Sequence, residues 1–181
     1  MSSANVKSPR DRIIDVAGPL FYKEGYRAVG VDRVIAEAAV AKATFYNHFP
    51  AKDDLIVAWI EKAEASANLN LPPVDGPAPL FAYADHMIDI AQKPWCMGCT
   101  YQGTAAEFKD ETHPAHAAAI KIKLRTLETI TLRARNQKAK NPQKTSEQVY
   151  LFLEGVWVSV RMFGSEAPIK NAKDAVRRLF D

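Results

Sequence analysis

The sequence predicts an all-α fold with about nine helices. Apolar residues recur at intervals of three and four residues along almost the whole chain, as they do on one face of an amphipathic helix. No stretch shows the sustained alternation of apolar and polar residues that is typical of a half-buried strand. Prolines separate the helices expected in the second half of the chain, at Pro94, Pro114, Pro142 and Pro168.

The first helix is expected to begin at Ser8, a capping residue, with Pro9 in the first helical position and Gly25 at its end. Its buried face is formed by Ile13, Ile14, Ala17, Leu20 and Phe21. Pro19 falls inside this segment, where it removes a backbone hydrogen bond. We therefore expect either a kink or a shorter helix there.

Two short helices follow at residues 31–38 and 41–48, joined by a turn at Ala39 and Val40, and a longer helix begins at Lys52. In a helix-turn-helix, the second helix enters the major groove of DNA while the first crosses the backbone. A helical hairpin that only packs a core has the same periodicity. The pattern alone therefore leaves both interpretations open.

A second domain is expected after the proline-rich segment 68–79, because this composition is typical of a junction. The predicted domains are residues 1–66, which hold the helix-turn-helix, and residues 67–181. The helices expected in the second domain lie at residues 80–92, 101–108, 115–138, 146–163 and 169–180.

The helix at 146–163 carries apolar residues on two sides, so both sides must be covered. We expect one side to face the core of its own domain and the other side, together with the last helix, to face a second subunit. The residues assigned to this dimer interface are Phe152, Val156, Val160, Phe163, Val176 and Leu179.

The positive charge lies at the front of the chain. The net charge is +3, and the first 52 residues hold eight basic and five acidic residues, which account for the whole excess. This distribution favours an anionic partner for that end. Met1 to Asp11 has no apolar run behind its charges, and no segment reaches the roughly 18 to 20 apolar residues that cross a bilayer. A cytoplasmic protein is expected.

The segment from Val31 to Ile56, VDRVIAEAAVAKATFYNHFPAKDDLI, resembles the signature of TetR/AcrR-family transcriptional regulators. The resemblance covers residues 10–59 closely, and its most specific part is Tyr46-x-His48-Phe49 followed by Lys52. Fainter similarity continues in Gly98-Cys99, in Ala105-Ala106-Glu107-Phe108 and in His113-Pro114. The resemblance implies a homodimeric repressor that binds a palindromic DNA operator and is released by a small-molecule effector.

The residues expected to contact DNA are Arg33, Ala41, Lys42, Ala43, Thr44, Tyr46, Asn47, His48 and Lys52. The first turn of the second short helix, from Lys42 to Thr44, has side chains that let the backbone come near base edges. The resemblance assigns phosphate contacts to Tyr46 and His48, and Lys52 begins a helix whose dipole favours an anion. A small core is expected to hold this helix at its angle: Val34, Ile35, Val40, Phe45 and Phe49.

The chain departs from the family pattern at helix starts and in the turn. The family often has glycine in the turn, where this chain has Ala39, and serine or threonine at the helix start, where it has Ala41. Gly30 stands where a capping threonine is common. A lost hydroxyl cap costs about 1 kcal/mol of helix stability. These changes are expected to lower operator affinity more than they affect the fold.

The second domain offers candidates for an effector pocket, although the same residues could simply fill its core. They are Phe81, Tyr83, Met87, Trp95, Cys99, Tyr101, Phe108 and Trp157. Glu107 could be a buried polar anchor for an effector or a contact at a helix end. The sequence does not indicate which compound binds.

Cys96 and Cys99 form a C-x-x-C pair, which can act as a thiol switch or supply half of a tetrahedral metal site. His86, His113 or His116 would have to supply the other half. A thiol- or metal-sensing DNA-binding regulator is therefore the alternative hypothesis. No nucleophile with a base, phosphate loop or metal cluster is recognisable, so we expect neither an enzyme nor a bound cofactor.

Overall fold

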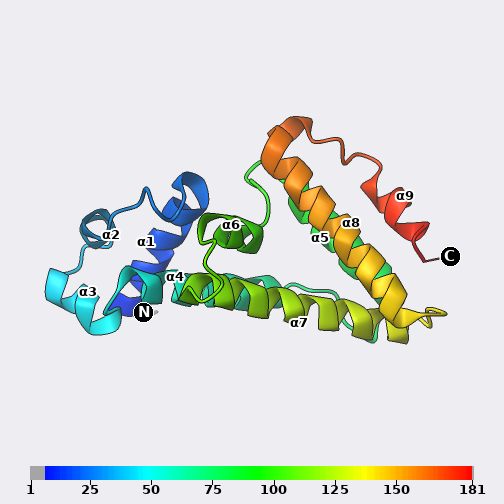
Figure 1. Ribbon diagram of the computed structural model, residues 1–181, viewed down its shortest axis with the longest axis horizontal. Helices are drawn as coiled ribbons and strands as arrows, with labels where there is room; N and C mark the ends of the chain where they lie inside the picture. The colour runs from blue at the N-terminus through cyan, green and yellow to red at the C-terminus, as the bar shows by residue number, and fades with distance from the viewer. Residues whose placement is uncertain (1–6, 181) are drawn as a thin grey trace, which may run out of the picture. The chain divides into compact units, whose positions relative to one another are not determined.

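The computed structural model describes residues 7–180, and within this range the protein is all-helical, as predicted (Figure 1). Its helices are α1 (Pro9–Glu24), α2 (Val31–Glu37), α3 (Lys42–His48), α4 (Lys52–Asn68), α5 (Pro79–Ala91), α6 (Thr100–Glu107), α7 (Pro114–Asn136), α8 (Pro142–Phe163), the 3₁₀ turn η1 (Gly164–Glu166) and α9 (Ala172–Arg177). The hypothesis about a secretion signal concerns mainly Met1 to Val6, which lie outside the described residues. Among the helices of residues 7–180, none has the length and apolar character needed to cross a bilayer.

The start of α1 confirms the predicted cap. The Ser8 hydroxyl accepts a hydrogen bond from the Asp11 backbone N–H at 3.1 Å, and Pro9 is the first helical residue. Of the two alternatives expected at Pro19, the shorter helix was wrong, because α1 continues through Pro19 to Glu24, and a kink there stays a prediction. Pro19 is exposed, so the carbonyl that loses its helical partner lies on the side of the helix that water can reach.

The chain forms two compact units. The N-terminal unit contains the residues up to Ala65 together with Thr104–Ala119, and the C-terminal unit contains Ser66–Gly103 together with the residues from Ile120 onwards. The predicted boundary after residue 66 lies beside the first of these divisions. The return of Thr104–Ala119 to the N-terminal unit was not predicted, because a single boundary cannot describe a domain that is built from two segments.

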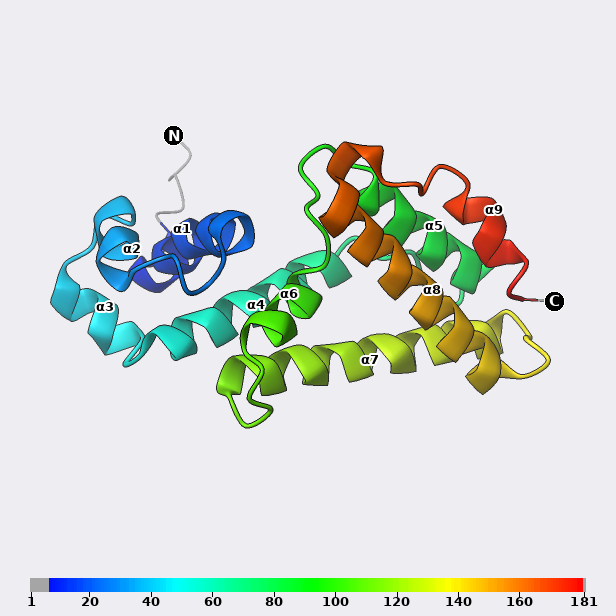
Figure 2. The same cartoon turned by 45° about the horizontal axis from the view of Figure 1, so that its top comes forward.

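In the C-terminal unit, α5, α8 and α9 pack against one another, and Figure 2 shows α5 beneath α8 and α9 beside them. The buried positions of α8 include Val149, Leu153, Val156 and Val160. They belong to one apolar core with Leu80, Ile88 and Val176 from the other two helices. The side of α8 that carries these residues is therefore filled by the unit's own helices.

The predicted junction before α5 is tied to α7 by a buried arginine. Arg133 is 1% exposed and its guanidinium donates to the carbonyls of Pro72, Pro73 and Pro79. The Asn136 amide donates to the Val74 carbonyl at 2.7 Å. A buried guanidinium needs such acceptors because an unsatisfied charge is costly in the interior. The proline-rich segment is therefore a fixed part of the C-terminal unit.

Candidate nucleic-acid interface

The turn between α2 and α3 has the geometry of a helix C-terminus capped by backbone hydrogen bonds. The Val40 N–H donates to the Ile35 carbonyl at 3.3 Å, and Ala39 adopts φ 51°, in the left-handed region. This is the arrangement in which glycine is usual, because a Cβ costs on the order of 1 kcal/mol there. Ala39, which replaces the glycine often found in the family, therefore has a mildly strained backbone conformation.

α3 is held by two phenylalanines on one of its faces. Phe45 is fully buried and Phe49 is 2% exposed, with ring centroids 5.9 Å apart. Val34 of α2 is buried as well, and α1 packs against both α2 and α3. The Arg10 guanidinium lies over the Phe49 ring, 5.4 Å from its centroid. The orientation of α3 is thus fixed by α1 and α2, as the predicted small core required.

The opposite face of α3 is open. Lys42, Ala43, Tyr46, Asn47 and His48 are exposed, and the Tyr46 side chain keeps 44% of its accessible surface. Ala41 is the N-cap residue and is also exposed, whereas Thr44 is half-buried. The structure therefore brings seven of the nine predicted contact residues together on one short helix and its cap.

Arg33 of α2 and Lys42 of α3, two of the predicted DNA contacts, are engaged in ion pairs. Arg33 bridges Glu24 and Glu37, at 2.6 and 2.8 Å, and these carboxylates raise the pKa of its guanidinium. Lys42 pairs with Asp32 at 3.1 Å, and this hydrogen bond raises the pKa of its ammonium. All these groups are exposed, so water and salt screen the pairs, and a phosphate could take the place of a carboxylate beside either cation.

Lys52 begins α4 as predicted, but its surroundings differ from the expectation. The side chain is half-buried, and this burial lowers the pKa of Lys52 against the opposing effect of Glu107 and Asp53. Asp53 and Asp54 occupy the first turn of α4, and Asp54 accepts a hydrogen bond from the Ala51 N–H at 2.8 Å. Carboxylates of the chain itself therefore already satisfy part of this helix end, which weakens the argument for an anion there.

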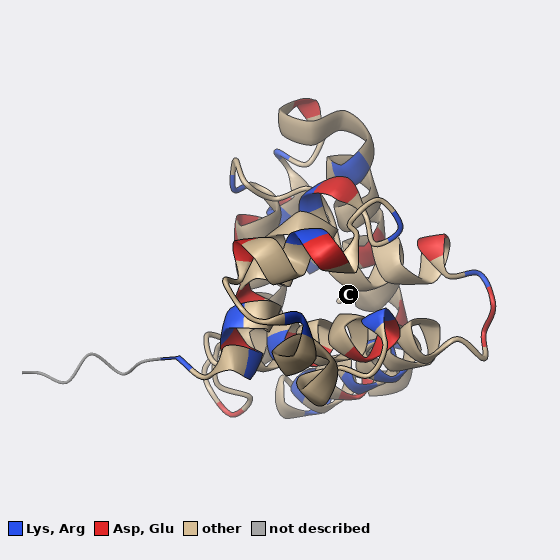
Figure 3. Cartoon of the chain, turned by 90° about the vertical axis from the view of Figure 1, so that its left-hand side faces the viewer, with Lys and Arg blue, Asp and Glu red and all other residues tan. Residues whose placement is uncertain are grey.

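Positive and negative side chains alternate across the molecule. In Figure 3, Lys and Arg are interspersed with Asp and Glu on the helices, rather than gathered in a continuous field. In the N-terminal unit, Lys7 and Lys62 both pair with Asp15 at 2.7 Å, in addition to the pairs of Arg33 and Lys42. An anionic partner would therefore be bound by a few directed contacts more than by a general positive potential.

The structure adds residues to the N-terminal unit that sequence analysis did not assign to it. Glu107 at the end of α6 accepts hydrogen bonds from the backbone N–H groups of Tyr26 and Arg27. The Tyr26 hydroxyl lies 2.6 Å from the Thr104 hydroxyl. The phenol ring of Tyr26 packs against Phe108 with centroids 5.5 Å apart. The partners lie about 80 positions apart in the sequence, so no local pattern could pair them.

The residues predicted to line an effector pocket belong to both units. Phe108, as just described, belongs to the core of the N-terminal unit. Phe81 contacts Phe180 edge to face, and Tyr83 is buried against the Arg133 guanidinium. Met87 packs on the apolar core, and Trp95 is 64% exposed. Three members lie on neighbouring segments of the C-terminal unit, namely the buried Cys99 and the half-buried Tyr101 and Trp157. The eight residues are therefore divided between the two units, and the effector pocket stays a prediction.

The residues assigned to a dimer interface need a similar correction. Val156, Val160 and Val176 are 5%, 3% and 0% exposed, because their stripe faces the core shared by α5, α8 and α9. Phe152 and Leu179 pack on the same core and are partly buried. Only Phe163, which is 53% exposed, lies open. The other stripe of α8, with Leu151, Val158 and Met162, is the exposed one.

The two cysteines are free thiols, and both are buried. In the part of the chain from residue 7 to residue 180, no group of three or more metal-binding side chains is found. His113 directly precedes α7, and its ring accepts a hydrogen bond from the Ala115 N–H at 3.2 Å. Its other ring nitrogen is 3.3 Å from Asp53. Within residues 7–180, Cys96 and Cys99 thus belong to no such group of metal-binding side chains.

Comparison with known proteins identifies the same region. Residues 13–59 match the family described as bacterial regulatory proteins, tetR family. A 54-residue stretch is 39% identical to the transposon Tn10 TetC protein of Escherichia coli. This stretch covers 30% of this chain and 27% of that protein. The match therefore spans about a quarter of the length of this relative.

Solved structures extend the similarity to the whole chain. A putative TetR transcriptional regulator from Streptomyces avermitilis is 26% identical, with a TM-score of 0.85 and 96% coverage of both chains. A TetR-family transcriptional regulator from Streptomyces coelicolor is 29% identical, with a TM-score of 0.82 and coverage of 95% and 94%. The reduced form of Escherichia coli NemR, at 18% identity and a TM-score of 0.81 over 96% and 98% of the two chains, shares the fold.

A short helix braced by two others, with its far face open, defines a protein of the helix-turn-helix class. The matched domain and the whole-chain similarity make the comparison more specific: residues 13–59 match the DNA-binding domain of the tetR family, and the chain shares its fold with TetR-family transcriptional regulators.

The N-cap of α3 offers a stability test. Ala41 has the extended backbone of an N-cap residue, φ −70° and ψ 149°, but its side chain makes no capping hydrogen bond. Ala41→Ser supplies a hydroxyl for an N–H of the first turn and is expected to raise the free energy of unfolding by about 0.5 to 1 kcal/mol. Ala43→Ser, two residues further along and also exposed, is the control and is expected to lower the free energy of unfolding by a few tenths of a kcal/mol. Chemical denaturation measures both, and an equal effect of the two substitutions would contradict the assigned cap.

Proposed function

We propose that this protein is a homodimeric transcription regulator that binds DNA by placing α3 of each subunit in the major groove. The observation that carries the proposal is the asymmetry of α3: one face is fixed by the buried Phe45 and Phe49, and the other exposes Lys42, Ala43 and Tyr46. A rigidly held helix with an open polar face is what reading of base edges requires.

Two kinds of contact follow from the positions along α3. Lys42 and Ala43 lie in its first turn, where a donor and a small side chain allow close approach to base edges. Tyr46 and His48 lie nearer its C-terminal end, where a hydroxyl and an imidazole can donate to phosphates and fix the register. Lys42 must exchange Asp32 for its DNA partner, and the exposure of this pair keeps the exchange inexpensive.

The dimer is proposed to form through the exposed face of α7 and α8. On α7 the apolar positions Ile120, Leu124 and Leu127 repeat at intervals of four and three residues, and Leu124 is 58% exposed. On α8 Leu151 and Met162 are 68% and 69% exposed. Such repeats form the seam of packed helical bundles, and large exposed apolar surface is uncommon in a protein that stays monomeric.

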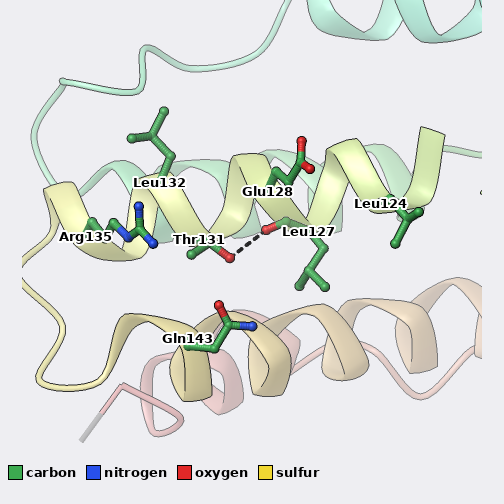
Figure 4. A pocket seen from close by; sticks show the side chains of 7 residues that line it. All are labelled: Leu124, Leu127, Glu128, Thr131, Leu132, Arg135 and Gln143. Carbon is green, nitrogen blue, oxygen red and sulfur yellow. Dashed lines mark hydrogen bonds between the residues drawn. The ribbon is translucent and has the colours of Figure 1, made fainter. Parts of the chain in front are cut away.

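A groove of about 420 Å³ runs along this face (Figure 4). Its lining consists of Leu124, Leu127, Glu128, Thr131, Leu132, Arg135 and Gln143. Figure 4 shows Leu127 pointing from α7 toward α8, and Gln143 pointing back toward α7. A two-fold axis that crosses α7 between Thr131 and Leu132 would bring Glu128 of one copy to Arg135 of the other. The face is therefore self-complementary in charge, as a two-fold interface requires.

Repression, and release by a small-molecule effector, are proposed from the family and concern the C-terminal unit. A coupling of about 1 to 3 kcal/mol between effector and operator sites changes operator affinity by about 5- to 150-fold, which is sufficient for regulation. The two Streptomyces proteins that share this fold are described as transcriptional regulators, which supports the proposal.

The contribution of α3 to DNA binding is tested by Lys42→Ala. The variant is expected to bind duplex DNA from the promoter region of its own gene more weakly than the wild type. The slope of log affinity against log salt concentration should become less steep by about 2, because each subunit of the dimer loses one cation. Lys140→Ala removes an exposed lysine of the C-terminal unit and should leave both quantities unchanged. Identical behaviour of the two variants in a salt titration would refute the role of α3.

The dimer face is tested by placing a charge on it. Leu151→Glu puts a carboxylate at a position that is 68% exposed, so the subunit should fold normally while association becomes unfavourable. Sedimentation velocity is expected to show a monomer for Leu151→Glu and a dimer for Leu69→Glu, a matched change at a leucine that is 84% exposed and lies before α5. A Leu151→Glu dimer as tight as the wild type would exclude this face.

A further inference from the structure

We infer that Glu107 is a positioning residue for DNA binding: from α6 it fixes the loop that sets α2 and α3 at their working angle. The inference rests on the proposed function, because it concerns how well α3 is presented to DNA. It goes beyond that function in assigning a role to a residue that lies far along the chain from the helix-turn-helix, on the segment Thr104–Ala119 of the N-terminal unit.

The contacts of Glu107 are directed at the backbone of the α1–α2 loop. Its Oε2 accepts from the Tyr26 N–H at 3.0 Å, and its Oε1 accepts from the Arg27 N–H at 2.5 Å. The Arg27 guanidinium returns a hydrogen bond to the Glu107 carbonyl at 3.2 Å. One carboxylate thus holds two consecutive peptide groups, which restricts the loop more than a contact to a flexible side chain would.

The backbone next to these groups is shaped for the contact. Gly25 ends α1 with φ 89°, a backbone conformation that residues other than glycine rarely adopt. A Cβ at Gly25 would stand 3.4 Å from Glu107 Oε2, which is an ordinary van der Waals contact. Gly25 is therefore needed for the turn of the chain, and this turn leads directly to the Tyr26 and Arg27 N–H groups that bind the carboxylate.

The surroundings hold Glu107 in place from the other side. Thr104, one turn earlier on α6, is fully buried and lies 2.6 Å from the Tyr26 hydroxyl. The Phe108 ring stacks on His113 with centroids 4.2 Å apart, and the His116 ring lies 2.6 Å from the Phe108 carbonyl. The end of α6 is therefore anchored on both sides of Glu107, so its carboxylate reaches the loop in a fixed position.

The loop transmits this position to α2. Tyr26 is 4% exposed and Val29 is fully buried, and α2 begins at Val31, immediately after Gly30. A shift at Tyr26 and Arg27 would therefore change where α2 begins, and α3 follows α2 through a turn of only four residues. Because productive base contacts depend on placement within a fraction of an ångström, a small change here is expected to reduce sequence-specific binding.

The charge of Glu107 provides a test with a distinctive sign. Glu107→Gln makes the DNA-binding unit one charge more positive, and general electrostatics predicts that this strengthens binding to any DNA. The positioning role predicts the reverse for the operator: about tenfold weaker specific binding, with non-specific binding unchanged or slightly tighter. Glu111→Gln, at an exposed carboxylate four residues further along the same segment, supplies the purely electrostatic baseline.

A second readout is independent of DNA. Hydrogen exchange followed by NMR should show the amides of Tyr26 and Arg27 exchanging about tenfold faster in Glu107→Gln than in Glu111→Gln, with the amides of α4 unchanged. A melting curve establishes that each variant is folded. If Glu107→Gln does not fold, Glu107→Asp, which keeps the charge but shortens the reach, is judged by the same two measurements.

The outcomes separate the two hypotheses. Weaker operator binding by Glu107→Gln together with faster exchange at Tyr26 and Arg27 supports the positioning role. Operator binding as tight as that of Glu111→Gln, or unchanged exchange at both amides, overturns it. If the wild-type protein shows no salt-sensitive DNA binding, the proposed function itself is overturned. If the wild type binds and Glu107→Gln binds equally well, only the positioning role is overturned.

Discussion

The structure depends on the burial of one face of α3 by the helices before it. A helix of seven residues is too short to be stable alone, since isolated helices need roughly 12 to 15 residues even with favourable composition. Phe45 and Phe49 supply the missing stability by entering the core formed with α1 and α2. This packing also fixes which side of α3 remains open, so stability and the presentation of Lys42 and Tyr46 have the same cause.

The unit that carries α3 is built from two segments that lie far apart in the chain. Thr104 and Glu107 complete the packing and hydrogen bonding of Tyr26, a residue that also contacts Phe21 and Trp59 with ring centroids 5.3 and 5.9 Å apart. Tyr26 is therefore the point at which α1, α4 and α6 meet within this unit. Residues 100–103 of α6 belong to the C-terminal unit, so the same helix is part of both.

Local features could be predicted from the sequence because they depend on neighbouring residues. Helical periodicity placed the helices, and the Ser8-Pro9 cap, the Ala39 turn and the α3 signature all lie within short windows. Three features could not be found in this way. The choice between the two stripes of α8 depends on where α5 and α9 pack, the predicted pocket residues are divided between the two units, and the Glu107 contact joins positions about 80 apart. The shorter helix expected at Pro19 was wrong because the exposure of Pro19, which makes this residue tolerable within α1, is a tertiary property.

The central claim is that the amino end of α3 faces the bases of DNA. Its most direct test is cleavage of bound DNA by an iron chelate attached to Ala43→Cys, an exposed position, since Cys96 and Cys99 are buried and should not react with the label. With α3 of each subunit in the major groove, two clusters of cuts are expected in the operator, about one helical turn apart. Cuts no different from those of a chelate attached to Lys140→Cys would contradict the central claim.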